Sequence, residues 1–344
     1  MKKETLHKSD PTAEQRKRDH IELAFKSQVA KSEVDHRFFY EPILSGLPQD
    51  YNQWGAFPFL GKKLRYPLWV SSMTGGTEWA GTINHNLAKV VNEYGLGMGL
   101  GSCRSLLFDD KHLQDFAVRN LIGDQPLYAN LGIAQLEELI LSNQLGRVKE
   151  LIKKLEADGL IIHVNPLQEA MQPEGDVYSM APLEIIKRVL DFVDFPIIVK
   201  EVGQGMGPES LRQLMKLPLA ALDFAASGGT NFALLELMRE DESVLKAFDP
   251  LTHVGHSAED MVSFLNELVT EEPGLFACKE VIISGGIKNF LDGYYLIGKS
   301  KLPAIYGQAS GFLRHARGNY EELQTYVEQQ IKGLGLAKLF LKVR

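Results

Sequence analysis

Short apolar runs recur along most of the chain, and most of them are continuous rather than alternating with polar residues. Eight such runs cover residues 67–73, 95–102, 125–132, 159–165, 195–201, 219–225, 279–285 and 302–307. Strands of a parallel sheet have this pattern because both of their faces are buried. We therefore predict eight buried parallel strands.

Amphipathic segments lie between these runs, with apolar residues at helical spacing. Examples are residues 82–94, 135–158, 182–193, 208–217, 257–269 and 288–299. Eight alternations of strand and helix predict an α/β fold, a (β/α)₈ TIM barrel, rather than a doubly wound open sheet.

The ends of the chain lie outside this repeat. Residues 1–66 mix charged and aromatic residues, and we expect them to form an N-terminal arm and lid over the barrel. The barrel would occupy residues 67–344, with one or two closing helices near the C-terminus.

Composition and charge narrow the class of protein. Of the 344 residues, 44% are hydrophobic and 24% charged, which excludes a disordered or fibrous chain. The net charge of −7 gives no general attraction to nucleic acid or to an anionic membrane. Cys103 and Cys278 form no paired motif, and no apolar run approaches the ~20 residues of a membrane span. We expect a cytoplasmic protein without nucleic-acid or membrane partners.

Polar and glycine residues gather where the predicted strands end, which is where a barrel builds its active site. Lys200 closes an apolar run, so its ammonium needs a partner: a cofactor anion, an electron-rich ring or, as a structural alternative, a barrel carboxylate. Glycine-rich loops at 285–287 and 307–310 follow the last two strands. Together they predict a phosphate-binding site.

The segment 163–176 is the densest polar cluster in the chain. His163 and Asn165 have the period-two spacing of a strand and therefore face the same space. A carboxylate such as Glu169, which follows Gln168 on the next loop, could hold Mg²⁺. Taken alone, His163 would be a hydrogen-bonded core histidine.

A basic cluster near the N-terminus contains Arg16, Lys17 and His20. Such a cluster is either a solvated tail or a group that binds an anionic substrate over the barrel mouth. Arg104, which follows the second predicted strand, could join it there. The pattern alone does not choose between these hypotheses.

Several motifs, taken in order, resemble the type 2 isopentenyl diphosphate isomerases over residues 16–313. They are RKRDHI, SSMTGG, GSCR, NLG, HVNPLQE, QPEGD, VKEVGQGM, SGGTNF and SGGIKN. HVNPLQE with QPEGD is specific, whereas SMTGG, VKEVG and the GGI loop are shared with other FMN barrels. The resemblance implies an FMN-dependent barrel that interconverts isopentenyl and dimethylallyl diphosphate. It also implies Mg²⁺, reduced flavin with NADPH as the reductant, and a homo-oligomer of four or more chains.

The same resemblance implies roles for individual residues. The FMN-binding residues would be Ser72, Met73, Thr74, Ser102, Asn130, Lys200, Thr230, Gly286, Ile287, Lys288, Ala309 and Ser310. The substrate-binding residues would be Arg16, Lys17, His20, Ser102, Arg104, His163, Asn165 and Gln168. Gln168 and His163 would be catalytic, and Glu169 would bind the metal.

Five positions depart from the family pattern: Cys103 stands for glutamine, Asn231 and Phe232 follow the GGT motif in place of Ser-Trp, Lys288 stands for arginine, and Phe290 stands for glycine. Two rival hypotheses remain. One is an FMN-dependent oxidoreductase of the hydroxy-acid type, with His253 or His256 as its catalytic histidine. The other is a non-catalytic barrel that binds a phosphorylated metabolite.

Overall fold

The computed structural model describes residues 12–72 and 78–344, and its centre is a closed barrel of parallel strands. The strands are β4 (Leu68–Val70), β5 (Gly97–Gly99), β6 (Leu127–Gly132), β7 (Gly159–His163), β8 (Ile197–Lys200), β9 (Ala221–Asp223), β10 (Val281–Ser284) and β11 (Ala304–Gln308). They pair in chain order, and β11 pairs with β4 to close the barrel. The predicted TIM barrel is confirmed.

Continuous apolar runs form these strands because the two faces of each strand bury their side chains in different cores. Ile161, Ile198 and Ile282 pack inside the barrel. Their chain neighbours, such as Ile162 and Val199, pack between the barrel and the surrounding helices. Alternate residues of a strand point to opposite faces, so both positions must be apolar.

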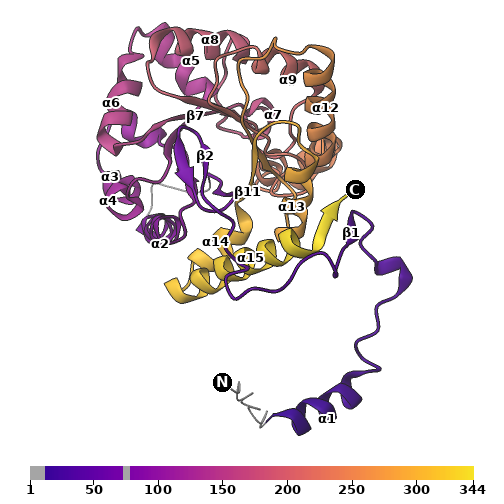
Figure 1. Ribbon diagram of the computed structural model, residues 1–344. Helices are drawn as coiled ribbons and strands as arrows, with labels where there is room; N and C mark the ends of the chain where they lie inside the picture. The colour runs from indigo at the N-terminus through magenta and orange to yellow at the C-terminus, as the bar shows by residue number, and fades with distance from the viewer. Residues whose placement is uncertain (1–11, 73–77) are drawn as a thin grey trace.

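Helices surround the barrel (Figure 1). The helices between strands and behind the barrel are α2 (Glu78–Tyr94), α5 (Ile133–Leu141), α6 (Gly146–Leu155), α8 (Pro182–Phe192), α9 (Pro208–Met215), α12 (Ala258–Glu271), α13 (Phe290–Lys299) and α14 (Ser310–Ala316). The single segment expected at 135–158 is thus two helices. Asn143, with a φ of 56°, has a left-handed backbone that interrupts the helical path between them.

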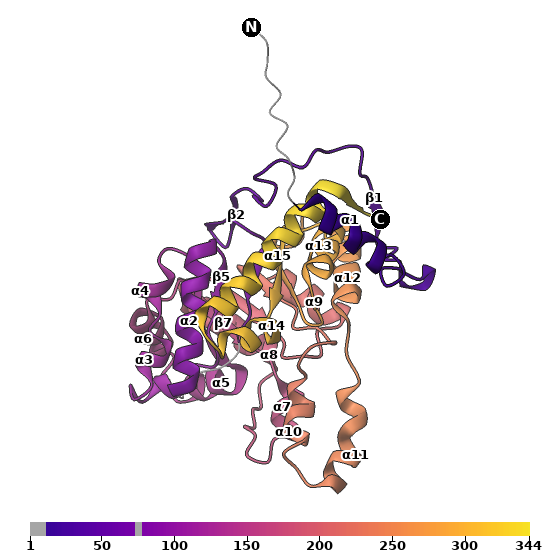
Figure 2. The same cartoon turned by 90° about the horizontal axis from the view of Figure 1, so that it is seen from below.

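Shorter helices stand in the loops at the carboxyl ends of the strands. They are η2 (Arg104–Leu107), α3 (Leu113–Phe116), α4 (Arg119–Ile122), α7 (Pro166–Met171), α10 (Phe232–Leu237) and α11 (Glu242–Thr252). Figure 2 shows α7, α10 and α11 grouped together and projecting beyond the barrel. Since α7 follows β7 and α10 follows β9, this projection marks the mouth of the barrel.

A hairpin of β2 (Phe57–Phe59) and β3 (Lys62–Leu64) closes the opposite end of the barrel. Its two-residue turn has positive φ at Leu60 and Gly61, as the tightest hairpins require. The Leu60 N–H donates to the Glu280 carboxylate over 2.8 Å, and Glu280 stands immediately before β10. The sequence did not predict that this segment would seal the amino-terminal end of the strands.

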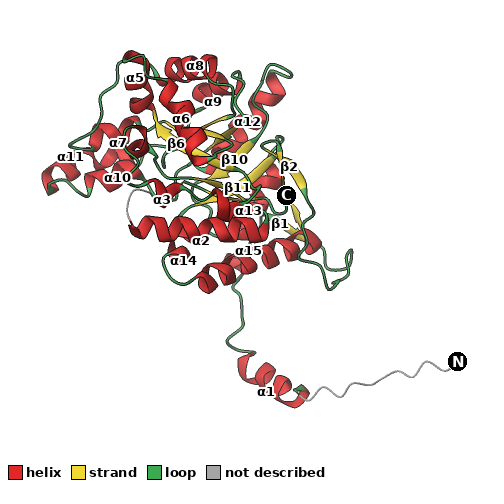
Figure 3. Ribbon diagram, turned by 90° about the vertical axis from the view of Figure 1, so that its left-hand side faces the viewer, coloured by secondary structure: helices red, strands yellow, loops and turns green. Residues whose placement is uncertain are grey.

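The remaining N-terminal elements are α1 (Ala13–Leu23), η1 (Lys31–Glu33) and β1 (Phe38–Tyr40). None of the residues of α1 is buried, and the helix lies apart from the barrel (Figures 1 and 3). The role of this arm as a lid stays a prediction.

The C-terminal end contains one long helix, α15 (Tyr320–Phe340), followed by the short strand β12 (Leu341–Val343). β12 pairs antiparallel with β1, so the two ends of the chain are joined. Arg37, next to β1, forms an ion pair of 2.9 Å with Asp292 on α13. Within residues 12–72 and 78–344, no helix combines the length and apolar character needed to cross a bilayer.

We predict that Leu64→Ala lowers the free energy of unfolding by about 2–5 kcal/mol, because it empties a fully buried position between the hairpin and the barrel interior. Urea denaturation followed by tryptophan fluorescence measures the change. Lys63→Ala, on the exposed face of the same strand, is the control and should change it by less than about 0.5 kcal/mol. Equal effects of the two changes would contradict a sealing role for the hairpin.

Candidate active site

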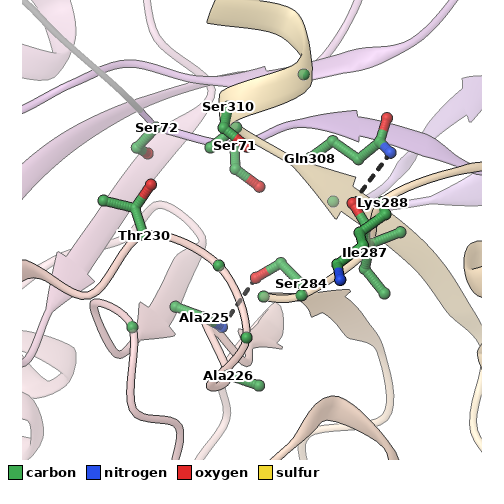
Figure 4. Close-up of a pocket in the computed structure, with 18 of the residues that line it drawn as sticks. Ser71, Ser72, Ala225, Ala226, Thr230, Ser284, Ile287, Lys288, Gln308 and Ser310 are labelled. Atoms are coloured by element: carbon green, nitrogen blue, oxygen red, sulfur yellow. Dashed lines mark hydrogen bonds between the residues drawn. The ribbon is translucent and has the colours of Figure 1, made fainter. Parts of the chain in front are cut away.

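A cavity of ≈ 330 Å³ lies at the mouth, between the loops that follow β4, β8, β9, β10 and β11 (Figure 4). Eight of the predicted flavin-binding residues line it: Ser72, Lys200, Thr230, Gly286, Ile287, Lys288, Ala309 and Ser310. Met73 and Thr74 lie outside the described residues. The structure therefore brings together polar groups from five separate strand ends.

Glycines let the loops after β9 and β10 pack closely enough to form one wall of this pocket. Gly285 has a φ of 91°, and a Cβ there would lie 2.1 Å from the Ala226 carbonyl oxygen. A Cβ on Gly228 would lie 3.2 Å from the Cα of Gly286. The backbone N–H groups of Gly286 and Ile287 donate to no acceptor within the described part of the chain. The wall thus offers free donors to an anionic ligand.

Two serines at the end of β4 line the side of the pocket (Figure 4). The hydroxyl oxygens of Ser71 and Ser72 are buried and have no hydrogen-bond partner among the residues that the structure describes. Buried polar groups are nearly always satisfied. These two hydroxyls therefore suit a ligand with polar atoms at its edge.

Lys200 ends β8 inside the pocket and is only 7% exposed. Its ammonium donates to the Glu201 carbonyl oxygen over 2.7 Å. No carboxylate among residues 12–72 and 78–344 forms an ion pair with it within 4.0 Å, so the expected structural alternative is not found. Burial lowers the pKa of Lys200, and the negative charges of Asp223 and Glu201 oppose that shift.

Asp223 stands beside Lys200 on the next strand, in direct register. It is completely buried, and the Ser284 hydroxyl donates to its carboxylate. Burial raises the pKa of Asp223, while Lys200 and the Ser284 hydrogen bond act in the opposite direction. The other carboxylate oxygen has no partner in the described chain. The sequence analysis did not single out this residue, which lies within an apolar run.

His163 ends β7 and is held by Asn130 across the strands. The amide nitrogen of Asn130 donates to the Leu100 carbonyl oxygen, so its oxygen accepts from His163 Nδ1 over 2.8 Å. The other ring nitrogen is then an acceptor. Burial, aided by the charge of Lys200, lowers the pKa of His163 to about 3. Asn130 supports this neutral imidazole and does not line the cavity beside Lys200. Its role toward a flavin stays a prediction.

The predicted polar cluster after β7 is connected by hydrogen bonds. Asn165 donates to Gln168 over 3.1 Å and to Glu169 over 2.8 Å. Gln168 donates to Glu236 on α10 over 3.0 Å, which ties α7 to α10. The Asp176 N–H donates to the second oxygen of Glu169. These residues cluster as expected, but none of them lines the cavity beside Lys200.

Ser102 and Arg104 lie in a separate recess on the outer side of the mouth, together with Gln135. Arg104 forms an ion pair of 2.6 Å with Asp176. Gln135 donates to the same carboxylate over 2.9 Å. Ser102 therefore does not line the cavity beside Lys200, and its role toward a flavin stays a prediction. Arg104 reaches the polar cluster through Asp176.

The remaining basic candidates stay away from the pocket. Arg16, Lys17 and His20 are on α1, which lies apart from the barrel (Figure 1). Their role toward a substrate stays a prediction. His253 and His256, which the oxidoreductase hypothesis needs, do not line the cavity either.

Some pocket residues were not predicted from the sequence. Gln308, Arg314, His315 and Tyr326 line the end of the cavity beside Ala309 and Ser310. Gln308 directly follows a predicted strand, so its position was a usable signal. Tyr326 belongs to α15, and nothing in the local sequence connects that helix to the pocket.

Among the residues that the structure describes, no group of three or more His, Cys, Asp or Glu side chains could hold a metal ion. The two oxygens of Glu169 each accept one hydrogen bond. A carboxylate oxygen has a second lone pair. Glu169 could therefore contribute one ligand to a cation whose other ligands come from water or substrate.

The fold is similar to that of several solved flavoproteins. A flavocytochrome b2 variant with sulfite aligns with a TM-score of 0.61 and 13% identity, covering 88% of this chain and 72% of that one. A mandelate oxidase variant with benzaldehyde aligns with a TM-score of 0.57 and 13% identity, over 88% and 82% of the two chains. A lactate oxidase from Pediococcus acidilactici has a TM-score of 0.55 and 15% identity, over 88% and 79%. At these identities the likeness concerns the fold.

No family model matches the chain. The barrel and the polar pocket at its mouth define an enzyme of the (β/α)₈ class. The isopentenyl-diphosphate delta-isomerase of Rickettsia felis is 34% identical over 322 residues, 92% of this chain and 90% of that protein. The enzyme of the same name from Rickettsia rickettsii is 35% identical over 324 residues, 92% and 91% of the two proteins. The chain belongs to the isopentenyl-diphosphate delta-isomerase family.

We predict that His163→Gln flattens the dependence of stability on pH between pH 7 and pH 5. The folded protein keeps His163 unprotonated down to a pKa of about 3, whereas the unfolded chain takes up a proton below about 6.5. The wild-type protein therefore loses stability as the pH falls, by up to about 1.4 kcal/mol per pH unit, and the variant lacks this contribution. Urea denaturation at several pH values measures the difference, and parallel profiles would contradict a neutral His163.

Proposed function

We propose that this protein is the FMN-dependent, type 2 form of isopentenyl-diphosphate isomerase. It would interconvert isopentenyl and dimethylallyl diphosphate with reduced FMN and Mg²⁺, and NADPH would reduce the flavin. The observation that carries the proposal is the pocket at the mouth. A buried lysine meets there two serine hydroxyls and backbone N–H groups that have no partner in the described part of the chain.

These groups fit the parts of FMN. Lys200 and the serines suit the polar edge of the isoalloxazine ring, and the ammonium has two donors beyond its bond to Glu201. The free N–H groups of Gly286 and Ile287, together with the exposed Lys288, suit the phosphate. Thr230, Ala309 and Ser310 would complete that end. The family membership and the fold of the solved flavoproteins support the same ligand.

The reaction adds a proton to one carbon of an alkene and removes a proton from another. Bound reduced FMN would supply a proton donor and acceptor in a pocket that offers few other bases. Lys200 would favour the anionic reduced ring by charge attraction. Phe232, which lines the cavity, would face the cationic state of the substrate with an aromatic ring and help to exclude water.

The residues after β7 would receive the substrate. Glu169 would hold Mg²⁺, which usually takes one or two protein carboxylates and completes its shell with water and phosphate oxygens. Gln168 would lie near the alkene, with its side chain oriented by Asn165 and Glu236. His163, kept neutral, would accept a hydrogen bond rather than compete with the metal for the diphosphate.

We expect the purified protein to be yellow from bound FMN. With Mg²⁺, a flavin reductant and isopentenyl diphosphate, it should form dimethylallyl diphosphate, and without the reductant it should form almost none, because the oxidised ring lacks the required proton. Absorbance spectra and product analysis measure both results. Flavin reduction by lactate or mandelate, without isomerisation, would instead support an oxidoreductase.

We predict that Glu169→Gln raises the Mg²⁺ concentration for half-maximal isomerisation at least about tenfold, since it removes the charged ligand. Glu174→Gln is the matched control: Glu174 stands just after α7, the helix that carries Glu169, and pairs with Arg239. Its substitution should leave the Mg²⁺ dependence unchanged. Identical Mg²⁺ curves for wild type and Glu169→Gln would refute a metal role for Glu169.

A further inference from the structure

A hydrogen-bonded chain runs from helix α15 to the glycine loop after β10. Tyr326 donates from its hydroxyl group to Gln308 Oε1 over 2.8 Å. Gln308 Nε2 donates to the Ile287 carbonyl oxygen over 3.2 Å, as Figure 4 shows. Tyr326 is distant from this loop in sequence, yet Tyr326 and Ile287, the two ends of this hydrogen-bonded chain, both line the pocket.

Packing fixes the position of the Tyr326 ring. The ring meets Phe312 edge to face, with centroids 5.6 Å apart, and stacks on His315 with centroids 4.5 Å apart. Phe312 is completely buried. Gly311 approaches so closely that a Cβ there would lie 2.3 Å from the phenol oxygen. The packing of the ring therefore fixes the position of the Tyr326 hydroxyl.

Gln308 is equally restricted. It is 4% exposed, and its backbone pairs with Val70 in the closing register of the barrel. Because the Ile287 carbonyl can only accept, the amide nitrogen of Gln308 must face it, and the phenol then donates to the amide oxygen. Burial raises the pKa of Tyr326 to about 12, so the donor keeps its proton at working pH.

The hydrogen bonds of Tyr326 and Gln308 hold one peptide group of the glycine loop in place. The Ile287 carbonyl accepts from Gln308, and the N–H of the same peptide, at Lys288, donates to Asp292 over 2.9 Å. Both polar atoms of this peptide are thus already bonded to side chains of the protein. The preceding N–H groups, at Gly286 and Ile287, have no acceptor in the described chain. They are the donors left over for a ligand.

We propose that Tyr326 and Gln308 are positioning residues for the phosphate group of FMN. They hold the Ile287–Lys288 peptide so that the free N–H groups of the loop stay directed at the phosphate end of the pocket. This inference rests on the proposed function. It adds that the two residues give the pocket its preference for FMN over riboflavin, which has the same ring and ribityl chain but no phosphate.

The test compares the binding of FMN and riboflavin to the full-length protein freed of flavin, by quenching of flavin fluorescence. Tyr326→Phe should weaken FMN binding roughly tenfold, because it leaves the buried Gln308 oxygen unsatisfied. It should change riboflavin binding less than about twofold, within the error of such comparisons. Tyr320→Phe is the matched control, since Tyr320 is on the same helix and donates to Glu93, away from this pocket.

A double-mutant cycle tests whether Tyr326 and Gln308 affect FMN binding through the same series of hydrogen bonds. Gln308→Met removes both hydrogen bonds at nearly constant volume and should weaken FMN binding at least as much as Tyr326→Phe. Adding Tyr326→Phe to Gln308→Met should then have almost no further effect. Additive losses would show that the residues act separately and would overturn the proposal.

Other outcomes are equally decisive. Equal losses for FMN and riboflavin would mean that Tyr326 only supports the fold, and an unchanged FMN affinity would mean that it has no role in binding. Either result overturns the inference while the proposed function stands. Wild-type protein that bound neither flavin would defeat the proposed function, and the positioning role with it.

Discussion

The pairing of β11 with β4 closes the barrel, and the whole arrangement at the mouth depends on its register. Gly307 pairs with Trp69 and Gln308 with Val70. Inside the barrel, a Cβ on Gly307 would lie 2.6 Å from the Ser71 hydroxyl and 3.0 Å from Ser284. A slip of one residue would exchange the faces of the strand, placing the Gln308 amide inside and the glycine against the helices. The closing register therefore fixes the positions of Ser71, Gly307 and Gln308 relative to one another.

A row of three titratable residues crosses the neighbouring strands at the same level. His163 pairs with Lys200, and Lys200 pairs with Asp223. Burial, together with the charge of Lys200, lowers the pKa of His163. Burial also lowers the pKa of Lys200, and the carboxylate of Asp223 opposes that shift. Because parallel strands end at the same edge, the row needs no loop to assemble it. The barrel thus places an imidazole, an amine and a carboxyl group side by side.

The sequence predicted those features that depend on residues close together in the chain. Burial of both strand faces leaves continuous apolar runs, so the strands and the polar residues at their ends could be identified, Lys200 and Gln168 among them. Other features depend on contacts between residues that are far apart in the sequence. Nothing near Tyr326 indicates that its hydroxyl meets Gln308, and the pairing of β1 with β12 depends on the two ends meeting in space. The side-chain partner of Asn130 is likewise not local in the sequence: its amide oxygen meets His163 on the neighbouring strand.

The cluster after β7 has more acceptors than donors, and this bears on which ligand it suits. Asn165 donates its amide N–H groups to Gln168 and Glu169. Its side-chain oxygen is buried and has no donor in the described chain. An anionic diphosphate would add further acceptors beside a carboxylate and would be repelled. The waters of a hydrated cation are donors, and its charge attracts the Glu169 carboxylate. Under the proposed function, the cation would enter beside Asn165 and Glu169. The diphosphate would then be bound through that cation and through arginine or lysine side chains.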